Sequence, residues 1–294
     1  MELRRLRYFH VLARELHFRK AAEKLFIVQP ALSRQVKELE AELGVVLLQR
    51  TKRSVTLTPA GAYLKEALEP LLQQVEELQQ KVKLIASGLE GEIRIGYVGS
   101  SVNTILPKLL PILSKKYPGI QTYLSELPSS NQLAAIRNKD LDIGFLRNPA
   151  PDPALETMVV WREPFYVVLP AWHSITARNF KSLMQVSKEK FILPPSTDGE
   201  LYHRHILGIC EEAGFNPMVA HESTHGNTIL KLVENGLGIS ILPLTFKKLA
   251  GKGVRFISLK HTSRKAELTA VWLKENHNGT LQKLKEIMRP MQVS

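Results

Sequence analysis

The sequence predicts an α/β protein whose N-terminal part is all-α, followed by a long connecting helix and two α/β lobes. Three observations support this fold class. Apolar residues recur at helical spacing through the first 44 residues, an apolar repeat of four and three runs through residues 64–85, and strand-like and helical segments alternate from residue 92 onward. At 294 residues the chain is long enough for two or three domains, each with a core of its own.

The N-terminal part is predicted to contain three helices. The first covers residues 3–16 and packs behind the other two, and the second begins at residue 18. The third opens at Gln29-Pro30, since proline is tolerated where its missing N–H would be unpaired anyway, and it ends at Gly44. The apolar faces of the second and third helices are Phe18, Ala21, Ala22 and Leu25, and Leu32, Val36, Leu39 and Leu43.

The second and third helices have the form of a helix-turn-helix, and the polar side of the third suits DNA. Gln and Arg can form paired hydrogen bonds with adenine and guanine edges, while Ser, Arg and Lys can also bind phosphate. The predicted DNA-binding residues on this helix are Gln29, Pro30, Ala31, Ser33, Arg34 and Lys37. The same spacing also fits an ordinary pair of amphipathic helices with solvated polar faces.

Residues 45–58 change to a strand-like pattern around a basic turn at 50–53. This predicts a wing, in which Arg50 and Arg53 contact the DNA backbone or the minor groove. A solvated hairpin tip is the alternative. The first 60 residues hold twelve Lys/Arg against six Asp/Glu, which is +6 of the net charge of +12, and this excess favours contact with phosphate.

A long helix is predicted to begin at Thr58-Pro59, with Thr58 as its cap. Its apolar seam consists of Leu64, Leu68, Leu71, Val75, Leu78, Val82 and Ile85. An exposed helix with such a seam needs a partner, so the pattern predicts a dimer. Pro70 lies inside the pattern and is expected to kink the helix or weaken one turn.

The remainder of the chain predicts alternating strands and helices. The expected strands are 93–98, 120–126, 141–146, 165–169, 191–193, 218–221, 239–242 and 268–273, and the expected helices are 104–117, 129–138, 201–213, 228–234 and 281–288. Such alternation favours a parallel sheet with crossover helices. The predicted domains are 1–58, the linker helix 59–88, and 92–294, with lobe I at about 92–161 and 266–294 and lobe II at about 162–265.

Several polar residues follow predicted strands. In open α/β sheets, ligands bind beyond the carboxyl ends of strands, at helix N-termini. The candidate ligand-binding residues selected by this rule are Ser100, Ser101, Ser129, Arg147, Ser196, Thr197, His225 and Asn227. Hydroxyl groups, free backbone N–H groups and one arginine suit a small carboxylate or a similar anion. For any single serine, helix capping is the alternative.

The N-terminal residues also carry a dense family signature, namely Phe9, Ala21-Ala22, Leu25, Gln29-Pro30, Ser33, Leu39-Glu40, Leu43-Gly44, Leu47, Arg50 and Leu57-Thr58-Pro59-Ala60-Gly61. In these residues the chain resembles the LysR-type transcriptional regulators, and the resemblance continues through its whole length. It implies a winged helix-turn-helix, a linker helix, and an effector domain similar to periplasmic solute-binding proteins. His17 and Val28 replace the serine-like caps usual in the family, so both helices are expected to lose a side-chain cap, at a cost of about 1 kcal/mol each.

The same resemblance implies the partners. They are double-stranded promoter DNA, a small-molecule effector, and further copies of the chain, as a dimer through the linker helix or a homotetramer through the effector domains. RNA polymerase is a further candidate partner. No cofactor is expected.

A second resemblance concerns the effector. Met1-Glu2-Leu3-Arg4, residues 21–25, residues 93–100 and Gly144-Phe145 with Arg147 resemble the subgroup that senses aromatic-degradation intermediates in benzoate, muconate and catechol pathways. By this resemblance, anion binding falls on Ser100, Ser129, Arg147 and Ser196, and the effector is a muconate-like or aromatic acid. Thr224-His225 departs from the subgroup, which can be charged there.

A rival interpretation comes from His221-Glu222-Ser223-Thr224-His225, which matches the H-E-x-x-H pattern of zinc peptidases. That chemistry requires both histidines on one face of a helix. Because residues 217–220 predict a strand and Gly226 follows directly, we expect the histidines to flank a strand end and a loop. The alternative function is a cytoplasmic small-molecule-binding protein, or a metalloenzyme that uses His221, Glu222 and His225. Because the two histidines are not expected to share a helix face, we expect the protein not to be an enzyme.

Two further expectations concern the environment of the chain. Cys210 is the only cysteine and lies among apolar residues, which predicts a buried, inert thiol. No apolar run approaches the ~18 residues of a membrane span. The first residues lead into an amphipathic helix without a signal-peptide core, so we expect a cytoplasmic protein without a membrane partner.

Overall fold

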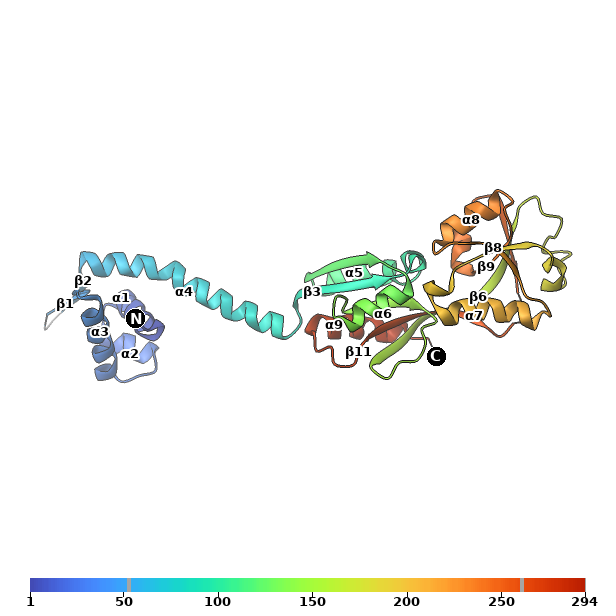
Figure 1. The fold of residues 1–294 in the computed structure, drawn as a ribbon. Coiled ribbons are helices and arrows are strands. Elements are labelled where there is room, and N and C mark those ends of the chain that lie inside the picture. Colours follow the sequence, from blue (N-terminus) through green and yellow to red (C-terminus); the bar gives the residue numbers. More distant parts are fainter. Residues whose placement is uncertain (52–53, 260–261, 294) are drawn as a thin grey trace. The chain divides into compact units, whose positions relative to one another are not determined.

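The computed structural model describes residues 1–51, 54–259 and 262–293 (Figure 1). The chain forms two compact units, Met1–Lys83 and Leu84–Ser294. No helix in the described part of the chain is long and apolar enough to cross a membrane.

The first unit consists of three short helices, a hairpin and most of a long helix. Its elements are α1 (Leu3–Glu15), α2 (Phe18–Lys24), α3 (Gln29–Leu43), the antiparallel pair β1 (Leu48–Arg50) and β2 (Val55–Leu57), and α4 (Pro59–Ala86). The core contains Leu6, Phe9 and Leu12 of α1, Ala21 and Ala22 of α2, and Leu32, Val36 and Leu39 of α3. The predicted helices are therefore confirmed. Leu43 was predicted to be part of the core but is 37% exposed, because the apolar face of α3 ends at Leu39.

Helix caps and one carboxylate hold these elements together. Val28 supplies no side-chain cap to α3, as predicted. His17 does cap α2, because its Nδ1 accepts a hydrogen bond from the Lys20 N–H (3.3 Å), so the expectation of a lost cap was wrong there. The Glu40 side chain of α3 accepts hydrogen bonds from the Leu47 and Leu48 N–H groups (3.0 and 3.1 Å), which fastens α3 to the hairpin.

Helix α4 begins as predicted and runs through Pro70 without interruption. Thr58 Oγ1 accepts a hydrogen bond from the Gly61 N–H (3.0 Å). A Cβ at Gly61 would lie 2.0 Å from the Leu47 carbonyl oxygen, so only glycine allows α4 to approach the hairpin this closely. Leu68 and Leu72 are buried against the core of the first unit. Of the seam residues farther along α4, Val75 is half-buried, and Leu71, Leu78, Val82 and Ile85 are exposed.

The second unit contains nine strands and five α-helices among its described residues. Its strands are β3 (Glu90–Tyr97), β4 (Gly119–Glu126), β5 (Ile143–Arg147), β6 (Leu155–Pro170), β7 (Lys190–Leu193), β8 (Met218–Glu222), β9 (Ser240–Pro243), β10 (Val254–Ser258) and β11 (Lys265–Leu273). Its helices are α5 (Leu106–Lys116), α6 (Ser129–Arg137), α7 (Glu200–Glu212), α8 (Gly226–Glu234) and α9 (Gly279–Met288), with short 3-10 turns that include η1 (Gly99–Asn103), η3 (Ser196–Asp198) and η4 (Leu244–Lys248).

The main sheet is mixed rather than parallel. Its order is β10-β6-β11-β5-β3-β4, and β9 also pairs with β6. β3 is parallel to β4 and β5, whereas β11 is antiparallel to both β5 and β6. The parallel expectation was therefore wrong for part of the sheet. The chain passes from one lobe to the other along β6 and returns along β11, so these two strands run in opposite directions.

β6 joins the two lobes. Its residues 155–164 pair with β11 in lobe I, and residues 165–170 pair with β9 and β10 in lobe II. The sequence predicted only 165–169 of this strand and did not predict β10.

Helices cover both faces of the strands in each lobe (Figure 1). In lobe I, α5 and α9 pack on one face with Phe145 and Leu268, while α6 packs on the other face with Leu146 and Val271. In lobe II, α7 packs against Phe165, Val167 and Leu169 of β6, and α8 packs against Val168. Successive residues of a strand point to opposite faces, which explains this division.

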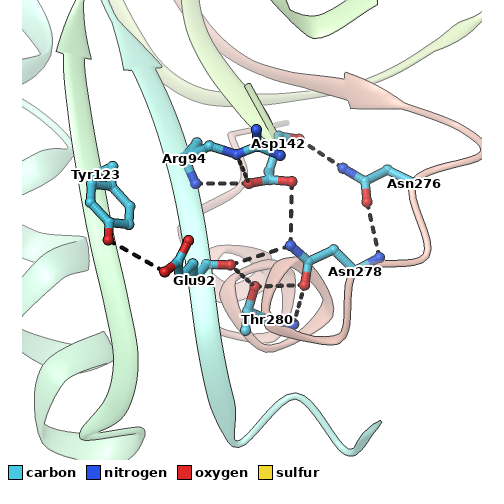
Figure 2. Close-up of polar contacts among 7 residues, drawn as sticks. All are labelled: Glu92, Arg94, Tyr123, Asp142, Asn276, Asn278 and Thr280. Atoms are coloured by element: carbon cyan, nitrogen blue, oxygen red, sulfur yellow. Dashed lines mark hydrogen bonds and ion pairs between the residues drawn. The ribbon is translucent and has the colours of Figure 1, made fainter. Parts of the chain in front are cut away.

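A polar cluster fastens the C-terminal helix to the start of lobe I (Figure 2). Asp142 is buried, and its Oδ2 accepts hydrogen bonds from the Arg94 N–H (2.8 Å) and Nε (3.3 Å). Asn278 Nδ2 donates to Asp142 Oδ1 (3.3 Å), and Asn278 Oδ1 caps α9 by accepting from the Thr280 N–H (3.0 Å). The close-up shows these side chains turned toward one another, which indicates a structural role.

Candidate functional site

The polar face of α3 lies opposite its buried face. Gln29, Pro30, Arg34 and Lys37 are exposed, while Ala31 and Ser33 are half-buried. Arg34 Nε lies 3.8 Å from Glu38 Oε1, and this exposed pair holds the guanidinium only weakly. The six predicted residues therefore occupy one accessible strip that begins at the N-terminus of the helix.

In the predicted wing, Arg50 stabilises the packing of the hairpin against the helices. Arg50 Nη2 donates to Glu40 Oε2 (2.9 Å), and its guanidinium lies 5.0 Å from the centre of the Phe18 ring. These contacts tie the hairpin to α2 and α3, so this guanidinium is less free to bind phosphate than those of the α3 strip. Arg53, the other predicted wing residue, lies outside the described residues.

A cavity of about 290 Å³ lies between the two lobes of the second unit. Lobe I contributes Ser100 and Asn103 from η1, Glu126 from the end of β4 and Arg147 from the end of β5. Lobe II contributes Tyr202, Phe246 and the segment 224–227 at the start of α8. The site thus forms where strand ends and helix N-termini meet, as the sequence predicted.

Arg147 is the buried cation of this cavity, with a side chain that is 4% exposed. Its Nη1 donates to Glu163 Oε1 (3.3 Å), and its guanidinium lies 5.7 and 6.0 Å from the ring centres of Tyr202 and Phe246. The other oxygen of Glu163 accepts hydrogen bonds from the Thr245 N–H and Oγ1, both at 2.6 Å. Glu163 therefore links Arg147 of lobe I to η4 of lobe II.

Two buried polar atoms in the cavity wall lack a protein partner. Within the described part of the chain, neither Arg147 Nη2 nor Ser100 Oγ has a hydrogen-bond partner. Buried polar groups are rarely left unpaired, since an unmade hydrogen bond costs about 1–3 kcal/mol. Both residues line the cavity, and a guanidinium N–H together with a hydroxyl is suited to a carboxylate.

The remaining predicted residues divide into three groups. Asn227 and His225 line the cavity and are exposed. Ser101 and Ser129 are buried beside it, where Ser129 Oγ accepts a hydrogen bond from the Arg147 N–H (3.4 Å). Ser196 and Thr197 lie in η3, are exposed, and are not among the residues that line the cavity.

Tyr202, Phe246, Glu126 and Glu163 are among the residues of the site that were not predicted from the sequence. Tyr202 lay within a predicted helix, Glu126 ended a predicted strand, and Phe246 belonged to no predicted element. Glu163 gave no signal except that a charged residue stands beside Pro164 at the start of an apolar strand. All four reach the site through the folding of segments that lie far apart in the sequence.

The H-E-x-x-H segment does not form a metal site. His221 and Glu222 lie in the exposed strand β8, and His225 precedes the first turn of α8, so the two histidines do not share a helix face. Among the described residues no group of three His, Cys, Asp or Glu side chains is arranged to hold a metal ion. This confirms the expected placement of the histidines.

Cys210 is buried in α7, and burial raises the pKa of its thiol to about 12. The thiol therefore stays protonated at neutral pH, as expected for an inert cysteine.

Comparison with known proteins agrees with this architecture. Residues 3–62 match the family described as "Bacterial regulatory helix-turn-helix protein, lysR family", and residues 86–291 match the "LysR substrate binding domain". The HTH-type transcriptional regulator AlsR of Bacillus subtilis is 34% identical over 96% of this chain and 93% of its own length. BenM of Acinetobacter baylyi, another HTH-type transcriptional regulator, is 34% identical over 88% of this chain and 86% of its own length.

Solved structures show the same similarity. The crystal structure of CbnR, a LysR family transcriptional regulator, aligns with a TM-score of 0.80 and 26% identity, covering 98% of this chain and 100% of that one. Full-length CbnR in complex with its target DNA aligns with the same score and identity over 99% of each chain.

Proposed function

Because the chain belongs to the LysR family of DNA-binding transcriptional regulators, we propose that α3 contacts promoter DNA and that a small organic acid in the lobe cavity controls this binding. Relatives across the family are named as regulators, and the chain is a regulator rather than an enzyme. The proposed functional ranges are 1–58 for DNA binding, 59–88 for pairing and 92–294 for effector binding.

The proposed DNA contacts are those of the exposed strip on α3, namely Gln29, Pro30, Ala31, Ser33, Arg34 and Lys37. Their position at the helix N-terminus fits the way a recognition helix enters the major groove. Arg53 is proposed as a phosphate or minor-groove contact. Arg50 is proposed chiefly to hold the hairpin in place, because Glu40 already neutralises its charge.

The seam of α4 supports pairing of two chains. Leu71, Leu78, Val82 and Ile85 are 44%, 65%, 59% and 51% exposed. Apolar side chains in a four-and-three repeat are stabilised when a second helix covers them. We assign this surface to a dimer, and a homotetramer through the effector domains would be built from two such dimers.

The pairing proposal has a direct test. Leu78→Asp places a charge in the seam and is expected to halve the molar mass measured by light scattering, from dimer to monomer or from tetramer to dimer. Gln80→Asp, which adds the same charge off the seam, serves as the control. A molar mass that stays unchanged in Leu78→Asp would rule out this interface.

The unpaired donors of the cavity carry the effector proposal. A carboxylate between Arg147 Nη2 and Ser100 Oγ would satisfy both, and the guanidinium would also supply charge. The volume of about 290 Å³ is near the lower end of ligand sites, which favours a small acid. Muconate-like and aromatic acids are the classes implied by the sequence.

Binding in this cavity would act on both lobes. Arg147 belongs to lobe I and the segment 224–227 to lobe II, so an acid touching both would favour the conformation in which they are close. The linker helix would carry the change to the DNA-binding heads, and altered promoter occupancy would then affect RNA polymerase.

The function is tested by binding to the DNA upstream of the chain's own coding sequence. We expect the protein to bind this upstream DNA more tightly than scrambled DNA across a salt series. We also expect one acid, from a panel that includes cis,cis-muconate and benzoate, to alter the protein's footprint on the DNA. Weak, sequence-blind binding that modest salt abolishes would show only that a chain of net charge +12 adheres to phosphate.

A further inference from the structure

We infer that the effector has a single carboxylate and, at its other end, a hydrogen-bond donor such as an ammonium or hydroxyl group, rather than a second carboxylate. Of the classes named above, this retains acids with one carboxylate and excludes muconate-like diacids. This inference rests on the proposed function of the cavity and concerns the opposite end from Arg147.

The cavity contains a fixed negative charge as well as a positive one. Among the described residues that line it, Arg147 and Glu126 are the two with a full charge. A second hollow of about 210 Å³ shares Gly99, Glu126, Thr224 and His225 with the first, so the cavity continues past this carboxylate. An acidic group that faces a ligand space disfavours an anion there.

The Glu126 carboxylate lies beside the loop that carries Ser100. A Cβ at Gly99 would lie 2.8 Å from Glu126 Oε1, so the carboxylate rests against the backbone of η1, one residue before Ser100. His225 Nδ1 lies 3.8 Å from the same oxygen, at the limit of an ion pair and with both side chains largely exposed. The contact with His225 is made by Oε1, and Oε2 is the oxygen proposed to accept a hydrogen bond from the ligand.

The positive charge of Arg147 already has a counter-ion in the protein. Its guanidinium pairs with Glu163, and both side chains are buried. The three fixed charges Arg147, Glu126 and Glu163 therefore sum to −1. A dicarboxylate would bring two more negative charges to this environment, whereas an acid with one carboxylate and one donor places complementary groups at both ends.

The uncharged residues of the cavity wall also suit a ligand with a hydrogen-bond donor. Asn103, Thr224 and Asn227 lie in the cavity wall and can accept hydrogen bonds through their side-chain oxygens. A ligand ammonium or hydroxyl near Glu126 would thus find several acceptors.

Matched acids test the inference. Linear acids of three to six carbons with a terminal amine, hydroxyl, methyl or second carboxylate are titrated by calorimetry into the full-length protein. At the best chain length, we expect the amino or hydroxy acid to bind at least about tenfold more tightly than the diacid. Glu126→Gln should reduce this ratio severalfold, and Glu126→Lys should reverse it. Glu275→Gln removes the same charge from an exposed position outside the cavity and should change nothing.

The outcomes separate the two proposals. If diacids bind as tightly as amino or hydroxy acids, and Arg147→Met abolishes that binding, the cavity is an acid site but the single-carboxylate inference is wrong. If no acid binds, or if Arg147→Met leaves binding unchanged, the proposed effector site fails and the inference fails with it. If Glu275→Gln changes the affinity ratio between amino or hydroxy acids and diacids as much as Glu126→Gln does, the proposed role of Glu126 is also wrong.

Discussion

Glu163 offers the sharpest test of how the cavity is built. Its carboxylate pairs with Arg147 at 3.3 Å and accepts two hydrogen bonds at 2.6 Å from Thr245. Glu163→Gln removes the charge but keeps the size of the side chain and one acceptor. The variant leaves the Arg147 guanidinium buried without its counter-ion, and an uncompensated buried charge is strongly destabilising.

The magnitude follows from this burial. Both side chains are at most 5% exposed, so water screens the pair little. We expect Glu163→Gln and Arg147→Met each to lower the free energy of unfolding by about 3 kcal/mol, the low end for breaking a buried pair. The double variant removes both charges, and its loss should be about 3 kcal/mol rather than the ~6 kcal/mol of an additive pair.

Urea unfolding measures these energies. All three tryptophans, Trp161, Trp172 and Trp272, lie in the second unit, so tryptophan fluorescence of the full-length chain reports on the effector domain. Strictly additive losses would refute the coupling between Glu163 and Arg147. The same Glu163→Gln variant should bind a monocarboxylate several times more tightly, because the charge of Arg147 is then available to the ligand alone.

Three other predictions address the rest of the chain. Arg34→Ala should weaken specific operator binding by about 1–3 kcal/mol in fluorescence anisotropy, while Arg178→Ala, which removes an equal charge from the effector domain, should not. Cys210, with a thiol pKa raised to about 12, should react with iodoacetamide only after unfolding, and rapid labelling of the native protein at pH 8 would contradict its burial. The hydrogen bond from His10 (2.7 Å) holds the pKa of Glu69 below its usual 4.5, so its stabilising effect is present above that pH and is lost as pH falls through the folded-state pKa. Glu69→Gln should therefore make the melting temperature less sensitive to acid below about pH 4.5, and an unchanged acid dependence would rule out this contribution.

The N-terminal helices and the long helix could be predicted closely because their signals are local. Periodic apolar residues define each buried face, and Pro30, Gly44 and Thr58 mark helix ends through their own backbone and capping chemistry. β6 was predicted only in part. Its first half carries charged residues and Pro164 is within it, so no simple alternation identifies a strand that is half in one lobe and half in the other.

The sequence by itself determined the fold class, the helix proposed to contact DNA, the apolar seam of α4 and Arg147 as the candidate anion ligand. Each depends on residues close together in the chain or on a strand end. Only the tertiary structure decided which charges meet Arg147. Glu163 lies 16 residues from Arg147 and 82 from Thr245, and Glu126 reaches the same cavity from another strand. Such long-range contacts depend on sheet order and lobe packing. No local pattern of residues encodes them, and they set the charge of the cavity.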